Sequence, residues 1–221
     1  MAATSAAMTQ SAIVKICGLS SPETLLAAIE SGADMAGFVF FEKSPRHIDL
    51  ETARTLGLLA QDRISKVALA VDPDDAALQD IVDALAPDYL QLHGSETPAR
   101  VAEVKARFGL PVIKAAGVAR PGDVEAARAY EGVADVILFD AKPAPNAAVP
   151  GGAGVAFDWD LLRGVAATQW MLSGGLTPEN VAEAMRRTGA RAVDVSSGVE
   201  RERGVKDAAK IAAFLAAARL S

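Results

Sequence analysis

Eight short apolar runs recur along the chain, and each is followed by a stretch with apolar residues at helical spacing, such as Leu25, Leu26 and Ile29. Strands that alternate with helices form parallel sheets, because each helix carries the chain back to the start of the next strand. The pattern therefore predicts eight parallel strands. They are expected at residues 13–17, 34–40, 66–71, 88–93, 111–115, 135–140, 168–172 and 191–196.

Two of the expected helices have marked starts. Ser21 and Thr177 each precede Pro and Glu, so the hydroxyl can cap the helix and Pro can take its first position. Eight strand and helix units in 221 residues favour one closed α/β barrel of the (β/α)8 or TIM type over an open doubly wound sheet, which has fewer strands. We expect this single domain to span residues 12–221, after a flexible N-terminal tail at residues 1–11.

Composition excludes several classes of protein. A net charge of −6 without a cluster of Lys or Arg argues against a nucleic-acid partner. No apolar stretch reaches the ~20 residues of a membrane span, and the start lacks the features of a signal peptide. Cys17 is the single cysteine, so no intramolecular disulfide forms and a cytoplasmic location is expected. The sequence shows no metal-thiolate cluster and has His47 and His93 as its two histidines, so no metal site is predicted.

Polar residues close most of the apolar runs, at the strand ends where barrels carry their active sites. The loops after the seventh and eighth strands often bind phosphate in such barrels. Gly174 and Gly175 let the backbone approach an anion, while Ser196, Ser197 and Gly198 offer hydroxyl and N–H groups. A single glycine-rich loop would be explained by a tight turn. Two such loops, after the seventh and eighth strands, predict a phosphate site.

Two further strand ends carry groups suited to proton transfer. Cys17 ends the first run just before Gly18, where a thiolate facing the mouth of the barrel can remove a carbon-bound proton. The alternative is a buried thiol that only packs in the core. Asp140 ends the sixth run after four apolar residues, which disfavour the charged form and suit a carboxylic acid that donates a proton. Capping of a loop, or pairing with Lys142, is the alternative.

Lys15 and Asp194 are predicted to form an ion pair beneath the site. Lys15 shares a strand face with Cys17, and Asp194 shares one with Ser196. The first and eighth strands are neighbours in a closed barrel, and either charge alone would be costly to bury there.

The two longest connections follow the second and sixth strands, at residues 41–50 and 141–157. Long loops in compact domains usually bind something. Arg46 lies in the first, where its guanidinium can grip a carboxylate at two points. The second is rich in Pro and Gly and is expected to act as a lid or to be a surface insertion. His93 ends the fourth strand and either contacts substrate or has a structural role.

Six motifs then occur in a specific order. They are Lys15-Ile16-Cys17-Gly18-Leu19, Ser44-Pro45-Arg46, Gln91-Leu92-His93-Gly94, Phe139-Asp140, Ser173-Gly174-Gly175-Leu176 and Asp194-Val195-Ser196-Ser197-Gly198-Val199-Glu200. Together they resemble the phosphoribosylanthranilate isomerase family of tryptophan biosynthesis. The resemblance runs from the first strand into the last helix and leaves only the N-terminal tail uncovered.

The resemblance implies a phosphorylated small-molecule substrate and a reaction without metal or cofactor. The family converts N-(5-phosphoribosyl)anthranilate to 1-(2-carboxyphenylamino)-1-deoxyribulose 5-phosphate by an Amadori rearrangement. It implies Cys17 as general base, Asp140 as general acid and Arg46 for the anthranilate carboxylate, with His93 and Asp194 as supporting residues that contact substrate. The phosphate then belongs to Gly174, Gly175 and the loop of residues 196–198.

Three alternatives stay open on the residues alone. Another phosphosugar isomerase or epimerase would share the phosphate loops, although a metal-dependent epimerase would need more His and acidic ligands. The next enzyme of the same pathway would need catalytic Lys and Glu positions that these motifs do not follow. A barrel could also bind a phosphorylated ligand without turning it over. We expect a monomer, with a homodimer as the alternative, and leave open a second aminoaldose substrate from histidine biosynthesis.

Overall fold

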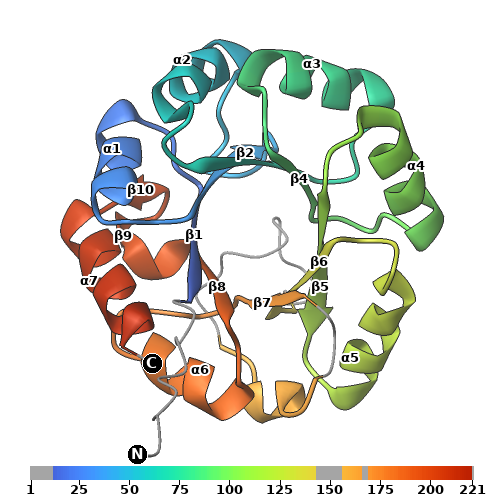
Figure 1. Cartoon of the computed structure of the whole chain (residues 1–221), viewed down its shortest axis with the longest axis vertical. Helices are drawn as coiled ribbons and strands as arrows, with labels where there is room; N and C mark the ends of the chain where they lie inside the picture. Colours follow the sequence, from blue (N-terminus) through green and yellow to red (C-terminus); the bar gives the residue numbers. More distant parts are fainter. Residues whose placement is uncertain (1–11, 143–155, 166–168, 221) are drawn as a thin grey trace, which may run out of the picture.

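The computed structural model describes residues 12–142, 156–165 and 169–220. Eight parallel strands pair in chain order and close into a barrel, because β8 also pairs with β1 (Figure 1). Each strand overlaps one of the eight apolar runs, so the predicted single-domain (β/α)8 barrel is confirmed. The strands are β1 (Ile13–Cys17), β2 (Met35–Phe40), β3 (Ser65–Ala70), β4 (Tyr89–Leu92), β5 (Val112–Val118), β6 (Val136–Ala141), β7 (Trp170–Leu172) and β8 (Ala192–Val195).

Helices surround the barrel as an outer ring (Figure 1). The α-helices are α1 (Pro22–Glu30), α2 (Leu50–Ala60), α3 (Asp75–Leu85), α4 (Pro98–Phe108), α5 (Pro121–Ala127), α6 (Val181–Thr188) and α7 (Ala208–Arg219). Short 3-10 helices are η1 (Arg128–Tyr130), η2 (Trp159–Leu162) and η3 (Ser197–Val199). In the described part of the connection from β6 to β7, η2 takes the place of an α-helix.

The two predicted helix starts differ in outcome. Ser21 caps α1 as predicted, and its Oγ accepts a hydrogen bond from the backbone N–H three residues later (3.3 Å). The prediction for Thr177 is wrong by three residues. Asn180 Oδ1 accepts a hydrogen bond from the Thr177 N–H (2.8 Å), and the turn this closes delays the start of α6 to Val181.

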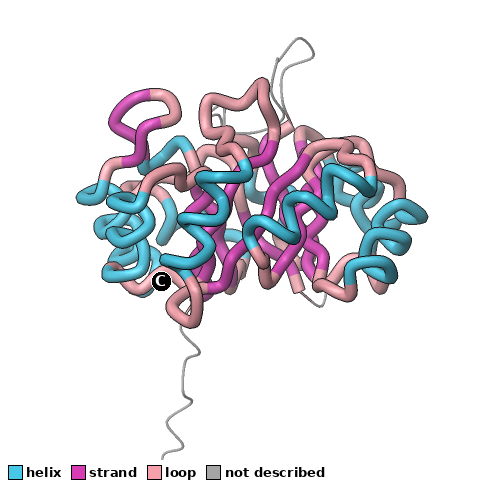
Figure 2. Tube along the Cα trace, turned by 90° about the horizontal axis from the view of Figure 1, so that it is seen from above, coloured by secondary structure: helices cyan, strands magenta, loops and turns pink. Residues whose placement is uncertain are grey.

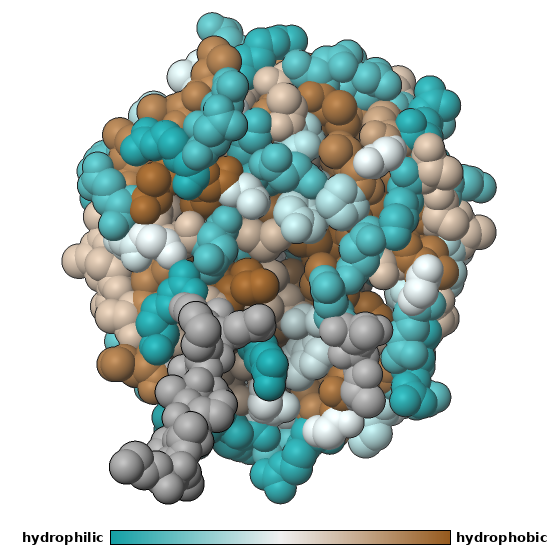
Figure 3. Space-filling model, viewed as in Figure 1, coloured by the Kyte–Doolittle hydropathy of each residue, from teal (hydrophilic) through white to brown (hydrophobic). Residues whose placement is uncertain are grey.

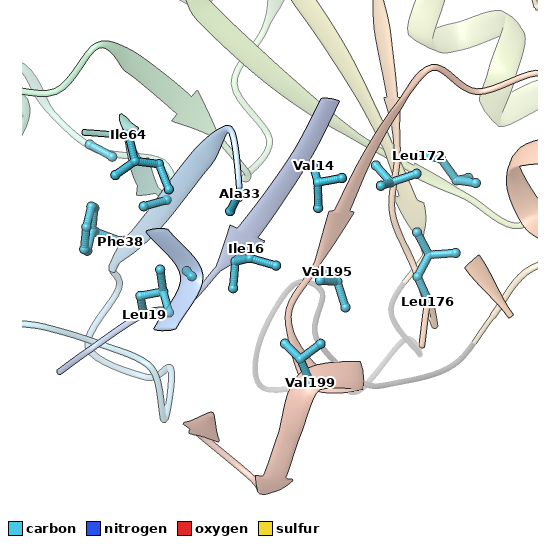
Figure 4. Close-up of a cluster of buried hydrophobic side chains, with 14 of the residues drawn as sticks. Val14, Ile16, Leu19, Ala33, Phe38, Ile64, Leu172, Leu176, Val195 and Val199 are labelled. Carbon is cyan, nitrogen blue, oxygen red and sulfur yellow. The ribbon is translucent and has the colours of Figure 1, made fainter. Parts of the chain in front are cut away.

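Side chains on the outer face of the strands form the larger core. Val14 and Ile16 of β1 alternate with inward-facing residues and are completely buried. Phe38 of β2 and Leu172 of β7 belong to the same cluster, between strands and helices (Figure 4). This layer fixes the strands in place and thereby the direction of the inward-facing side chains.

The inside of the barrel changes character along its axis. Met35, Val67 and Ile113 form part of a separate buried apolar cluster that fills the interior. Leu138 of β6 belongs to this cluster, whereas Asp140, two residues later on the same face, is a buried acid. The polar interior residues therefore lie toward the C-terminal ends of the strands, at the opening that we call the mouth.

A small antiparallel hairpin follows η3 and consists of β9 (Glu200–Glu202) and β10 (Val205–Lys206). It projects from one end of the barrel, opposite the end that holds the marked C-terminus (Figure 2). Among the described helices, none is long and apolar enough to cross a membrane. The predicted N-terminal tail lies outside the described residues, as does most of the predicted lid at residues 141–157.

Candidate active site

Cys17 ends β1 at the mouth and is 5% exposed. It packs with Val39 and Leu69 on the inner side of the barrel, so the thiol does not face the helix layer. Burial raises the pKa of the Cys17 thiol, although the positive charge of Lys15 counteracts part of this rise. A Cβ placed on Gly37 would lie 3.0 Å from Cys17 Sγ and 3.1 Å from Lys15 Nζ, so both groups occupy one small space above that glycine.

The predicted pair of Lys15 and Asp194 is confirmed. Lys15 Nζ donates a hydrogen bond to Asp194 Oδ1 (2.7 Å), and the two residues are also opposite each other in the pairing of β1 with β8. Burial lowers the pKa of Lys15, but the carboxylate of Asp194 and the sulfur of Cys17 outweigh this and the net direction is upward. Ser173 Oγ donates to the other oxygen of Asp194 (3.1 Å), so both carboxylate oxygens are held.

Asp140 lies beside His93 at the mouth. His93 Nε2 is 3.4 Å from Asp140 Oδ2, and the other carboxylate oxygen accepts a hydrogen bond from the Ala141 N–H (2.8 Å). The second ring nitrogen of His93 is 2.9 Å from Gln91 Nε2. Gln91 is fully buried, and its side chain ties His93 to the barrel interior. His93, predicted to contact substrate, therefore contacts the predicted acid.

The two predicted phosphate loops lie together between Cys17 and Asp140, because β7 and β8 separate β6 from β1 in the barrel. Gly174 has a φ of +86°, and a Cβ there would lie 2.6 Å from the Ala141 nitrogen and 3.1 Å from Asp140 Oδ1. Only glycine can approach the acid this closely. Gly175 also has a positive φ of 68°. A Cβ on Gly198 would overlap the Leu176 carbonyl, so the two loops pack directly on each other.

The loop after β8 is joined to Cys17 and to the hairpin. Ser196 Oγ donates a hydrogen bond to the Cys17 carbonyl (3.0 Å). Lys206 Nζ contacts both the carbonyl (2.9 Å) and the hydroxyl (3.1 Å) of Ser196 and forms an ion pair with Glu200 (2.7 Å). Ser197 and Gly198 begin the short helix η3 that connects these groups.

Arg46 lies on the connection after β2, and its side chain packs against Gly18, where a Cβ would lie 2.6 Å from Arg46 Cδ. The guanidinium of Arg46 forms a bidentate interaction with a carboxylate of the protein itself. Arg46 Nε and Nη2 donate to the two oxygens of Glu200 at 2.6 and 2.9 Å. Burial raises the pKa of Glu200, but the hydrogen bond from Arg46 and the charge of Lys206 outweigh this and lower it to about 2. A chain of polar contacts thus joins Arg46, Glu200, Lys206, Ser196 and the backbone of Cys17.

An apolar wall lies on the other side of Cys17. Val39 and Leu69 are buried next to the thiol, and Phe41 and Val71 pack against them. These four residues come from β2, β3 and the positions just after them. They give one side of the mouth an apolar surface, opposite the loops after β7 and β8.

Sequence reasoning missed the roles of Glu200 and Lys206. Glu200 was quoted in the last motif without a role, and Lys206 was not singled out. The only available signal was an acidic and a basic residue spaced six apart after the eighth strand, which is common on protein surfaces. Within residues 12–142, 156–165 and 169–220, no group of three or more His, Cys, Asp or Glu side chains is arranged to hold a metal ion.

Comparison with known proteins identifies relatives along nearly the whole chain. A family model described as N-(5'phosphoribosyl)anthranilate (PRA) isomerase matches residues 14–217. The N-(5'-phosphoribosyl)anthranilate isomerase of Rhodopseudomonas palustris (strain HaA2) is 57% identical over 212 residues, which cover 96% of this chain and 97% of the relative. That of Cereibacter sphaeroides (strain ATCC 17029 / ATH 2.4.9) is 57% identical over 207 residues, with 93% and 98% covered.

Solved structures agree with this. Phosphoribosyl anthranilate isomerase from Thermotoga maritima superposes with a TM-score of 0.85 at 36% identity, covering 95% of this chain and all of that one. A phosphoribosyl anthranilate isomerase in complex with reduced 1-(o-carboxyphenylamino)-1-deoxyribulose 5-phosphate superposes with a TM-score of 0.82 at 35% identity, with the same coverage. The chain therefore belongs to the N-(5'-phosphoribosyl)anthranilate isomerase family.

Proposed function

We propose that Cys17 and Asp140 carry out the proton transfers of the family's reaction, the Amadori rearrangement of N-(5-phosphoribosyl)anthranilate in tryptophan biosynthesis. One observation supports these roles above all. The thiol and the carboxyl end two strands of the same barrel on its inner side, and the two loops suited to phosphate lie between them. A sugar phosphate anchored by those loops has one proton-transfer group on each side.

The reaction needs an acid first and a base second. Asp140 gives its proton to the furanose ring oxygen, the bond from that oxygen to C1 breaks, and the nitrogen lone pair forms a protonated Schiff base at C1. The positive nitrogen acidifies the C–H bond at C2. Cys17, as thiolate, takes that proton and becomes a thiol, and the electron pair of the C–H bond forms an enolamine. Tautomerisation to the ketone completes the rearrangement without net oxidation.

The rest of the mouth suits the remaining parts of this substrate. Backbone N–H groups of Gly174, Gly175 and residues 196–198 are proposed to hold the phosphate, because glycine permits close approach of an anion to the backbone and the two loops pack on each other. The apolar wall beside Cys17 suits the aromatic ring. Arg46, whose guanidinium is fixed by Glu200, is proposed to bind the anthranilate carboxylate.

His93 and Asp194 are proposed to act at the edge of this site. His93 is within reach of the proposed acid, and Asp194 lies beneath the loops after β7 and β8, where Ser173 and Lys15 hold it. Both were expected to contact substrate, and a ribose hydroxyl above either residue would meet a hydrogen-bonding partner there.

Turnover of substrate generated in place tests the proposal, with the loss of anthranilate-type fluorescence as the measurement. We expect Cys17→Ala to lower turnover by about 10²- to 10⁴-fold, because a positioned general base contributes about that much. Binding of the reduced product analogue should survive in this variant, since the phosphate loops stay intact. A parent protein that binds the analogue but shows no turnover would instead indicate a binding barrel, and undiminished turnover in Cys17→Ala would exclude the thiol as base.

We also propose a monomer located in the cytoplasm. A solved relative from Thermotoga maritima is described as monomers generated from a dimeric enzyme, so relatives include a dimer. Here the described residues expose only Ile13, Leu58 and Leu220 as large hydrophobic residues, and hydrophilic and hydrophobic residues are interspersed on the face shown in Figure 3. A sedimentation velocity mass near twice the chain's 22.8 kDa would contradict the monomer.

A further inference from the structure

Lys15 is a fully buried lysine on the inner side of the barrel, two residues before Cys17 on the same strand face. Its ammonium forms an ion pair with Asp194 at 2.7 Å. The same ammonium reaches the space above Gly37 that also holds the Cys17 sulfur, with 3.1 and 3.0 Å to the position of a Cβ there. Lys15 therefore lies between a carboxylate and a thiol, and only the carboxylate is needed to neutralise it.

The charged groups that face Cys17 come from three strands. Lys15 lies on β1, Asp194 on β8 and Lys206 on β10, whereas β2 contributes Gly37, which has no side chain. The two lysines favour a negative charge on the sulfur and Asp194 opposes it, with Lys15 the strongest of the three. Burial favours the neutral thiol, so a base at this position needs a nearby cation.

We propose that Lys15 is a positioning residue that stabilises the thiolate of Cys17, with Asp194 holding its ammonium beneath the sulfur. The inference deepens the proposed function, because it explains how a buried thiol serves as a base. In the proton-transfer step the substrate's proton moves to Sγ, and Lys15 keeps its own proton throughout. Lys15 therefore acts by its charge and its place, without exchanging a proton.

The single cysteine of the chain makes the thiolate directly measurable. Thiolate absorbance in the ultraviolet is titrated without substrate, and the titration of the same protein carrying Cys17→Ser is subtracted to remove the tyrosines. Lys15→Met should lower the thiolate fraction at about pH 9 by about tenfold, which corresponds to a rise of about one unit in the thiol pKa. Lys15→Arg keeps the charge and should restore most of the parent's thiolate.

Two double variants control for folding. Lys15→Met alone leaves Asp194 buried without its partner, so Lys15→Met with Asp194→Asn removes both charges and should still lower the thiolate fraction, by a smaller factor. Lys114 is another buried strand lysine, paired with Glu96 at 2.9 Å, but it faces the helix layer, because Ile113 and Ala115 fill the interior. Lys114→Met with Glu96→Gln should leave the thiol titration unchanged.

The outcomes separate this inference from the proposed reaction. If the thiol of a natively folded Lys15→Met protein, or of its double variant with Asp194→Asn, titrates as in the parent, the inference is wrong. It is equally wrong if Lys15→Arg loses as much thiolate as Lys15→Met, since shape and not charge would then matter. If the thiolate falls as expected while the parent shows no isomerase turnover, the electrostatic role stands and the proposed reaction fails.

Discussion

The two ends of the barrel use carboxylates in different ways. At the end opposite the mouth, Asp34, Asp88 and Asp135 each precede an even-numbered strand and accept a hydrogen bond from a backbone N–H of the preceding strand (2.7, 2.7 and 2.8 Å). The same three residues donate their own N–H back to that strand at 3.0, 2.8 and 2.9 Å. Each aspartate thus closes one pair of strands.

At the mouth, two carboxylates bind buried cations, whereas the cations that pair with Asp34 and Asp135 at the other end, Arg219 and Lys105, are more exposed. Asp194 is held by Lys15, Glu200 by Arg46 and Lys206. These groups are buried, whereas Asp34 and Asp88 are exposed. A hydrogen bond at a strand end supports the fold in three equivalent places, while burying a charged pair carries a desolvation cost that its mutual attraction must offset.

The largest effect is expected from Asp140→Asn. The amide keeps the shape of the side chain but has no acidic proton, so turnover should fall by about 10²- to 10⁴-fold while the thermal unfolding midpoint changes little. The control is Asp123→Asn, which alters a carboxylate that pairs with Lys142 (3.0 Å) at the start of α5, outside the barrel interior. A similar loss of turnover in Asp123→Asn would show that the effect is not specific to Asp140, and would contradict its proposed role as the acid.

A smaller effect, on stability, is expected at the hairpin. Glu200→Gln removes the buried carboxylate that pairs with Arg46 and Lys206, which should lower the free energy of unfolding at neutral pH by about 3 kcal/mol. The substrate KM should rise more than kcat falls, because Glu200 fixes the guanidinium of Arg46, which is proposed to bind the substrate carboxylate. Glu202→Gln on the same strand changes an exposed residue and should stay within about 0.5 kcal/mol of the parent.

The pH dependence of the free energy of unfolding shows whether the negative charge of Glu200 stabilises the folded protein. The pKa of Glu200 is lowered from 4.5 to about 2 in the folded protein, so its stabilisation is fully present above pH 4.5 and is lost as the pH falls toward about 2. Urea unfolding at a series of pH values should therefore show the difference between parent and Glu200→Gln shrinking below about pH 4.5. A difference that stays constant down to the acid transition would mean that the charge of Glu200 does not carry the effect.

The sequence was sufficient for the barrel and for the position of each strand, although β5 runs three residues past its predicted end at Ala115. Each apolar run became a strand, because periodicity reports burial directly. The pair of Lys15 and Asp194 could also be predicted, since two opposite charges on adjacent interior strand faces have few other partners. The start of α6 could not be predicted, because the Asn180 side chain accepts a hydrogen bond from the Thr177 N–H, and local bonds of this kind compete with helix formation.

The residues that sequence reasoning missed depend on contacts distant along the chain. Arg46 and Glu200 lie 154 positions apart and meet only when the hairpin folds against the connection after β2. The same holds for Asp34, Asp88 and Asp135, which were included in the expected strands but given no role. Their partners become visible once the order of the strands is known, and the equivalent position before β8 is Arg191, so the repeat is broken in the fourth pair.

The smallest effect is expected at the end opposite the mouth. Asp88→Ala removes the acceptor for the Lys66 N–H at a partly buried strand end, and should lower the free energy of unfolding by about 1 kcal/mol without changing turnover. Asp80→Ala, on the exposed face of α3, is the matched control and should have little effect. Because the barrel is a closed ring, a loosened strand end could also disturb β3 and β4 at the mouth. If Asp88→Ala is measurably destabilised but keeps full turnover, the two ends of the barrel act independently of each other. If its turnover falls as far as that of Asp140→Asn, the two ends are coupled.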